Sequence, residues 1–333
     1  MESFDLLRNI WYVLIGVLFL GYSILDGFDL GIGCLLPFLA KNEKDKKAIF
    51  SSIAPFWDGN EVWIITGGAS LFAAFPQAYA TVFSGFYLAL MLLLFALIFR
   101  AVSIEFWHKD EKRRKFWEWT FIIGSFLPSL LYGVALGNVI VGIPLNENMD
   151  FTGNFFTLLR PYPLIIGLLG LSAIMLHGCT YAVLKTTGML QMRARKIAKT
   201  LWFIFIILFI FSFIANLIYT PENSGNFLAI LSVVTIWIAV ILNRIYLNKG
   251  KDKIAFYMSS LIFIGLWGIV GAIHFPNLVK ASNAPNLSLT IYNASSSELT
   301  LKIMLIIALI GMPIVIIYTA YVYKVFRGKV IHD

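Results

Sequence analysis

The sequence predicts an all-α polytopic membrane protein with nine transmembrane helices. Hydrophobic residues make up 59% of the chain, charged residues only 13%, and the mean hydropathy is +0.82. A soluble protein of 333 residues would need more polar surface than this composition supplies. Apolar runs of about 20 residues recur along the chain, the length that a helix needs to cross a roughly 30 Å hydrocarbon core. Such long continuous runs favour helices over the alternating strands of a β-barrel.

The first two predicted spans are unusual in length. The first, of about 31 residues at 1.5 Å each, would be roughly 46 Å long, so it must tilt, bend or project from the membrane. The second is short, and the segment 51–57 before it could complete the crossing. The nine spans lie near residues 10–40, 58–75, 80–99, 119–144, 163–184, 201–219, 227–242, 254–275 and 303–323.

The connections between these spans alternate in their content of Lys and Arg. Five connections and tails (41–47, 109–115, 185–199, 244–253 and 324–329) hold 21 basic residues, against four in the others. The positive-inside rule therefore places the N-terminus outside and the C-terminus inside, which requires an odd number of spans. The Lys and Arg residues of cytoplasmic loops also account for the net charge of +8, so this charge does not indicate nucleic-acid binding. No repeat or soluble domain is visible, so residues 1–333 are expected to form a single integral membrane domain.

Four carboxylates lie inside predicted spans, namely Asp26, Asp29, Asp58 and Glu61. A charge near the bilayer centre costs at least ~2.5–3.5 kcal/mol, so such residues usually face a protein interior or a water path. The predicted topology puts all four in the cytoplasmic half. Asp26 and Asp29 are spaced i,i+3, as are Asp58 and Glu61, so each pair would share one helix face.

These carboxylates have two interpretations, which can coexist. They could form a proton uptake path from the cytoplasm, in which carboxyl groups exchange protons through water. They could also be helix caps: Asp58 as N-cap and Glu61 at the third helical position match a capping box. The segment from Asp26 to Asp29 could likewise cap a break in the first helix.

Three further residues near these carboxylates have a structural and a functional interpretation. Arg100, at the cytoplasmic end of the third span, could pair with one of the carboxylates, but snorkelling to the headgroups is favoured. Trp57 and Trp63 bracket Asp58 and would either wall an internal path or pack between helices. The residues alone favour packing.

Haem ligation needs His, Met or Cys aimed into a helix bundle. The chain has four His, of which only His177 lies well inside a span. A lone buried His is more often a hydrogen-bonded core residue than a ligand, and the Met residues suit packing. We therefore expect no haem or other metal to be ligated by this chain.

Several motifs give the chain a resemblance to subunit II of cytochrome bd quinol oxidases, including the branch called cyanide-insensitive. The resemblance covers nearly the whole length. The most specific motifs are residues 21–31 (GYSILDGFDLG) and 52–63 (SIAPFWDGNEVW), supported by 83–87 (FSGFY), 99–100 (FR), 124–128 (GSFLP), 152–156 (TGNFF) and 293–300 (NASSSELT).

The resemblance implies a subunit of a bacterial inner-membrane enzyme that oxidises quinol and reduces dioxygen to water. Protons would be released outside and taken up inside, generating a proton motive force without pumping. In this family, subunit I binds two b-type haems, haem d and the quinol. Subunit II is its pseudo-symmetric partner, built from two four-helix bundles plus one extra helix and surrounded by membrane lipid. Whether a small single-helix subunit joins the complex stays open.

The resemblance also implies roles for individual residues. Asp29 and Asp58 match positions on a proton path toward the haem site, and Trp63 matches a position near an oxygen-access channel. Arg100 and Glu105 match supporting positions near the cytoplasmic side. This chain departs from some relatives in carrying Glu61 where they carry Gln. His177 also replaces a Gln.

Two other functions remain open on the sequence. A proton-coupled secondary transporter also shows Gly-interrupted spans with carboxylates near the midplane, although no inverted repeat is visible here. A purely structural assembly subunit would tolerate substitution of Asp29 and Asp58, whereas a proton path would not.

Overall fold

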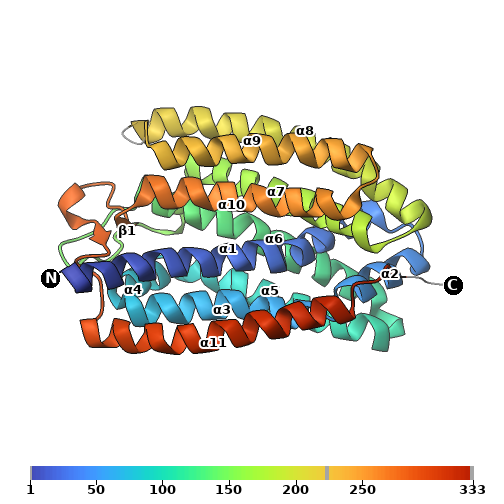
Figure 1. The fold of residues 1–333 in the computed structure, drawn as a ribbon, viewed down its shortest axis with the longest axis horizontal. Coiled ribbons are helices and arrows are strands. Elements are labelled where there is room, and N and C mark those ends of the chain that lie inside the picture. The colour runs from blue at the N-terminus through green and yellow to red at the C-terminus, as the bar shows by residue number, and fades with distance from the viewer. Residues whose placement is uncertain (1, 222–224, 331–333) are drawn as a thin grey trace.

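The computed structural model describes residues 2–221 and 225–330, and these residues form a bundle of long, roughly aligned helices (Figure 1). The predicted all-α architecture is confirmed for this part of the chain. Eight of its helices are long and apolar enough to cross a membrane. They are α1 (Glu2–Leu39), α5 (Tyr87–Lys109), α6 (Arg114–Val141), α7 (Pro161–Lys185), α8 (Gly188–Tyr219), α9 (Phe227–Asn248), α10 (Asp252–His274) and α11 (Glu298–Val325).

Helix α1 is continuous over 38 residues, a length of about 57 Å. The predicted alternative of a helix break capped by Asp26 and Asp29 is wrong. Both residues lie inside α1 with their side chains buried. They bond instead to side chains of neighbouring helices, so their polar atoms are used in tertiary structure.

The chain from Glu43 to Lys109, which includes the second and third predicted spans, contains four helices. These are α2 (Glu43–Ile53), α3 (Trp57–Ala74), α4 (Pro76–Gly85) and α5. The predicted span 80–99 is wrong in its bounds. The helix is interrupted at Phe86, between α4 and α5, and α5 continues ten residues past position 99. Pro76 begins α4, as the missing N–H and fixed φ of proline favour at a first helical position.

Helix α3 corresponds to the short second span. It has 18 residues, about 27 Å, and lies beside α1 and α11 (Figure 1). Its first turns carry Asp58, Asn60 and Glu61, and it is not among the eight helices that qualify by length and hydropathy. The count of nine spans therefore stays a prediction.

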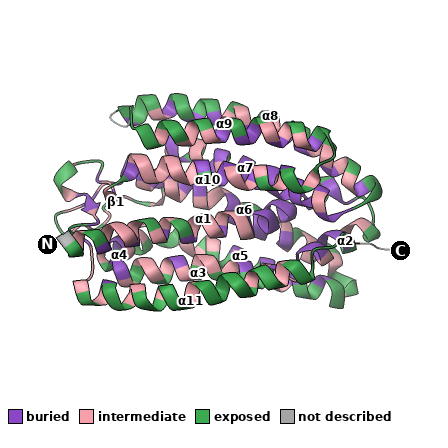
Figure 2. Cartoon of the chain, in the orientation of Figure 1, coloured by how far each residue is buried: buried purple, intermediate pink, exposed green. Residues whose placement is uncertain are grey.

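The helices pack in two groups that meet where α1 and α6 contact α7. Helix α1 contacts α3 and α6, and α6 contacts α5; α7 contacts α8 and α10, and α9 contacts α10. Gly31 of α1 and Gly178 of α7 lie against one another's backbone, so these two helices approach closely. Helix α11 lies on the outside, and its most apolar stretch is exposed (Figure 2).

Ordered connections close the end of the bundle that bears the N-terminus. Strands β1 (Asn277–Val279) and β2 (Leu289–Thr290) form a small antiparallel sheet, with the short helix η4 (Pro285–Leu287) between them. The loop after α6 bonds to this segment through the Ile143 N–H and the Lys280 carbonyl at 2.9 Å. Two further short helices are η1 (Glu111–Arg113) and η2 (Phe155–Leu158).

Candidate functional site

A cluster of buried polar side chains lies where four helices meet. Helix α1 supplies Asp26 and Asp29, α3 supplies Asn60 and Glu61, and α5 supplies Arg100; α11 adds Tyr323, described below. Asp26 bonds to Arg100 of α5 and Asp29 to Asn60 of α3, so the i,i+3 spacing brings both into one cluster, as a shared helix face predicts. Both are fully buried.

Arg100 joins two carboxylates from different helices. Its Nη2 lies 2.8 Å from Asp26 Oδ1, and its Nη1 lies 2.5 Å from Glu61 Oε1. The Arg100 side chain is 0% exposed, so the predicted snorkelling to the headgroups is wrong. An arginine cannot discard its charge, and two carboxylate partners offset the cost of burying it. Gly124 of α6 leaves room for Arg100, because a Cβ at position 124 would lie only 2.8 Å from Arg100 Cβ.

Asp29 is held from one side only. Asn60 Nδ2 donates to its Oδ2 at 2.7 Å. The other carboxyl oxygen, Oδ1, is buried and accepts from no group of residues 2–221 or 225–330. Asp26 Oδ2 is likewise buried and accepts a hydrogen bond from no group in the described part of the chain. The cluster thus holds two carboxyl oxygens that can accept a proton without displacing a protein donor.

The two carboxylates at the start of α3 differ in their surroundings. The Glu61 side chain is 20% exposed and bonds to Arg100, whereas Asp58 is exposed on the surface of this chain. The predicted capping box is wrong, because α3 takes Phe56 as its N-cap and has no side-chain cap. Asp58 already lies within the first helical turn. The structure therefore brings together Asp26, Asp29 and Glu61, and leaves Asp58 at the surface.

The remaining predicted residues lie around the cluster. The Trp63 ring packs on α1 at Gly21, where it leaves no room for a Cβ, so its predicted packing contact is confirmed. Trp57 is half-buried and packs against the main hydrophobic core. Glu105 is exposed near the end of α5, 3.6 Å from Lys109, and takes no part in the cluster.

Four polar contributors to this region were not predicted from the sequence. Asn60 donates to Asp29 and accepts from the hydroxyl of Tyr323 on α11 at 3.0 Å. The hydroxyls of Tyr22 and Tyr132 lie 3.2 Å apart between α1 and α6. Asn60 stands inside the WDGNEVW motif, which is the one sequence signal that could have pointed to it.

His177 is a hydrogen-bonded core residue, as predicted. Its Nδ1 lies 2.7 Å from the hydroxyl of Ser259, and its Nε2 lies 2.9 Å from the carbonyl oxygen of Ile24. The ring stacks on Phe256 at 4.8 Å between centroids. Since both ring nitrogens are engaged within the core, this residue does not fit the role of an axial haem ligand.

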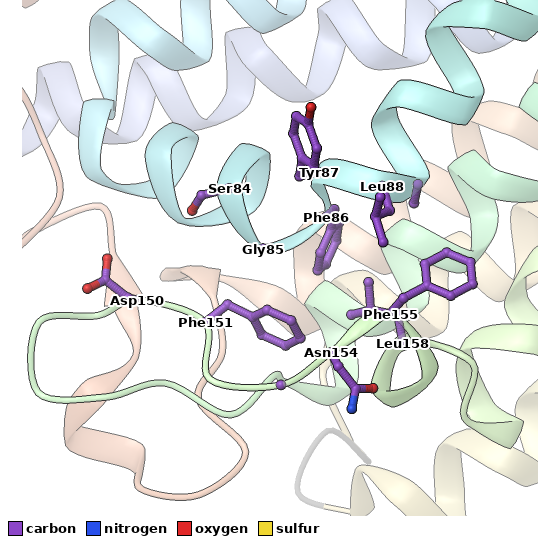
Figure 3. Close-up of a pocket in the computed structure, with 12 residues that line it drawn as sticks. Ser84, Gly85, Phe86, Tyr87, Leu88, Asp150, Phe151, Asn154, Phe155 and Leu158 are labelled. Atoms are coloured by element: carbon purple, nitrogen blue, oxygen red, sulfur yellow. The ribbon is translucent and has the colours of Figure 1, made fainter.

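A separate cavity of about 480 Å³ lies at the break between α4 and α5 (Figure 3). Its walls combine the end of α4, the start of α5 and the loop before α7, and Phe86, Phe151 and Phe155 form much of its lining. None of the cluster residues lines it. It is distinct from the carboxylate site.

Comparison with known proteins identifies the family of the chain. The sequence pattern of the family described as cytochrome bd terminal oxidase subunit II matches residues 7–326. The chain is 35% identical to cytochrome bd-I ubiquinol oxidase subunit 2 of Escherichia coli K12, covering 99% of this chain and 97% of that protein. It is 33% identical to cytochrome bd ubiquinol oxidase subunit 2 of Bacillus subtilis, covering 98% and 97%.

A solved structure has the same fold. A chain of the bd oxidase from Geobacillus thermodenitrificans superposes with a TM-score of 0.81 at 15% identity, over 96% of this chain and 98% of that one. At that identity the likeness concerns the fold, while the family match and the two relatives concern descent. The chain belongs to the family of cytochrome bd terminal oxidase subunit II.

Proposed function

We propose that this chain is subunit II of a quinol oxidase of the bacterial inner membrane that reduces dioxygen to water. The family match over residues 7–326 and relatives named ubiquinol oxidase subunit 2 support this function. Its partner is subunit I, which holds two b-type haems and haem d and oxidises the quinol. The haems supply the electron transfer and oxygen chemistry, and this chain handles protons.

We further propose nine crossings in a single integral membrane domain, with the N-terminus outside and the C-terminus inside. The ninth crossing is α3, which runs beside α1 and α11. In support, the start of α1 and the end of α11 lie at opposite ends of the bundle (Figure 1), as an odd number of crossings requires. The basic connections 109–115, 185–199 and 244–253 lie at the end that bears the C-terminus.

The cluster is a proton path from the cytoplasm toward the partner. One guanidinium, Arg100, pairs with the carboxyl groups of Asp26 and Glu61, and Asp29 adds a third carboxyl to the cluster, so the site has more proton-accepting groups than its one cation can neutralise. Ionisable residues inside membrane proteins mark ion pathways and proton relays among other functional sites. Exposed Asp58 is the first acceptor, Glu61 follows one helical turn later, and Asp29 receives the proton in the interior. The observation that carries the proposal is the buried group of Asp26, Asp29 and Glu61 around a single guanidinium.

The surrounding residues support the path. Trp57 and Trp63 form its wall on α3, where Trp63 borders oxygen access to the partner. Arg100 holds Asp26 and Glu61 in place, and Glu105 is a supporting residue at the surface near the end of α5.

Asp58→Asn tests the entrance. We expect oxygen consumption per haem to fall at least about tenfold, because the amide cannot accept a proton in a step of general acid–base type. Haem content, measured by the visible spectrum of the purified complex, should stay near normal because the Asp58 side chain is exposed in this chain. The control is Glu147→Gln, an exposed carboxylate in the loop after α6. Loss of all haem signal in Asp58→Asn would instead make Asp58 a structural residue.

A spectrum of the chain purified with and without its neighbour tests the complex itself. We expect a colourless isolated chain and a haem spectrum when subunit I co-purifies. A chain that never associates with a pigmented protein in its native membrane would contradict the proposed function.

A further inference from the structure

The side-chain amide of Asn60 is completely used by hydrogen bonds. Its Nδ2 donates to Asp29 Oδ2 at 2.7 Å and to the Leu25 carbonyl at 2.9 Å. Its Oδ1 accepts from the Tyr323 hydroxyl at 3.0 Å. Asn60 is 1% exposed. A flipped amide would place its oxygen against the Leu25 carbonyl and the Asp29 carboxylate, so the contacts leave one orientation for the group.

This fixed amide distinguishes the two oxygens of Asp29. Oδ2 always faces an N–H donor, whereas Oδ1 accepts from no group in the described part of the chain. A carboxylate held in this way binds an incoming proton at Oδ1 rather than at Oδ2. The second N–H of the Asn60 amide donates to the Leu25 carbonyl, one helical turn before Asp29 on α1, so the amide is held at two points of the same helix.

Tyr323 ties this arrangement to the last helix. Its ring stacks obliquely on Phe56, 4.5 Å away between centroids. Just beyond it, Lys185 Nζ donates to the Phe326 carbonyl at the end of α11, and the Val330 N–H donates to the Lys185 carbonyl at 2.8 Å. The exposed helix α11 is therefore anchored beside the cluster, where its tyrosine can hold the Asn60 amide.

We propose that Asn60 and Tyr323 are positioning residues that orient Asp29 so that its Oδ1 is the proton-accepting oxygen. This inference rests on the proposed proton path, of which it names two further members. Neither residue transfers a proton itself. Asn60 sets the direction of the Asp29 carboxyl, and Tyr323 sets the direction of Asn60.

The test uses the purified two-subunit complex. Tyr323→Phe removes one hydroxyl and keeps the ring packing, and Asn60→Ser removes the amide. Oxygen consumption per haem should fall about fivefold in Tyr323→Phe, the effect of losing one net hydrogen bond, and more in Asn60→Ser. The infrared carboxyl band that disappears in Asp29→Asn should shift in both variants. Added to Asp29→Asn, neither substitution should lower turnover further, because both act through Asp29.

The control is Tyr321→Phe, on the same helix but 65% exposed. It should leave both the turnover and the Asp29 band as in the parent complex. Unchanged turnover and an unchanged band in Tyr323→Phe would overturn the inference, as would losses that add fully to those of Asp29→Asn. If Asn60→Ser fails to assemble, Tyr323→Phe still decides. Full turnover in Asp29→Asn alone would instead refute the proton path itself.

Discussion

Arg100→Met is expected to prevent assembly of a stable complex. The Arg100 and Asp26 side chains are both 0% exposed, and Glu61 is 20% exposed, so removing the guanidinium leaves two carboxylates facing one another without a cation. Breaking a buried ion pair from one side costs about 3–5 kcal/mol. That is a large part of the roughly 5–15 kcal/mol that separates folded from unfolded proteins. Haem yield and the thermal unfolding midpoint of the complex measure the loss.

The cause of this loss can be separated from a packing defect. Adding Asp26→Asn and Glu61→Gln to Arg100→Met removes the uncompensated charges at nearly constant volume and should restore much of the yield. Arg113→Met is the matched control, since that side chain is 76% exposed and 4.0 Å from Asp110. It should assemble normally. An Arg100→Met complex that unfolds at the parent temperature would mean that the cluster contributes little to stability.

Gly31→Val is expected to separate α1 from α7. A Cβ at Gly31 would lie 2.9 Å from the Cα of Gly178, closer than real Cβ contacts, and the obstacle is backbone that cannot rotate away. Forcing extra atoms into such a contact typically costs about 1–3 kcal/mol and occasionally more. Small residues at these contacts are how membrane helices approach closely. The same shift would displace Asp29, two residues earlier on α1.

The expected result for Gly31→Val is a low yield of complex with a reduced unfolding temperature. Gly16→Val on the same helix provides the comparison, because a Cβ there meets nothing within 4 Å in this chain. It should change neither quantity measurably. Equal behaviour of the two variants would contradict a close α1–α7 contact.

Individual residues show what the sequence could predict about the site. The spacing of Asp26 and Asp29, together with the cost of a charge in lipid, correctly predicted two carboxylates facing the protein interior. The close contact between α1 and α7 explains why the last residue of the DGFDLG motif, Gly31, is a glycine. His177 was also predicted correctly, because a lone histidine inside a bundle has few roles besides hydrogen bonding.

The wrong predictions concern residues whose contacts depend on tertiary structure. Arg100 pairs with residues 39 and 74 positions away, and no local pattern reveals such partners. The capping box at Asp58 failed because Glu61 turns toward Arg100 rather than toward its own backbone. The break at Phe86 follows Ser84 and Gly85, two small residues inside a mostly apolar segment, and mean hydropathy over the span does not register so local a change. Asn60 is a single amide whose importance depends on Asp29 and Tyr323.

Proton uptake by the complex reconstituted in liposomes tests the role of Asp29 most directly. The rate of uptake from the cytoplasmic side is recorded after mixing the reduced enzyme with oxygen, for the parent and for Asp29→Asn. We predict uptake at least about tenfold slower in Asp29→Asn, with a normal haem spectrum. Uptake at the parent rate in a fully assembled Asp29→Asn complex would show that protons reach the partner without passing through this carboxyl.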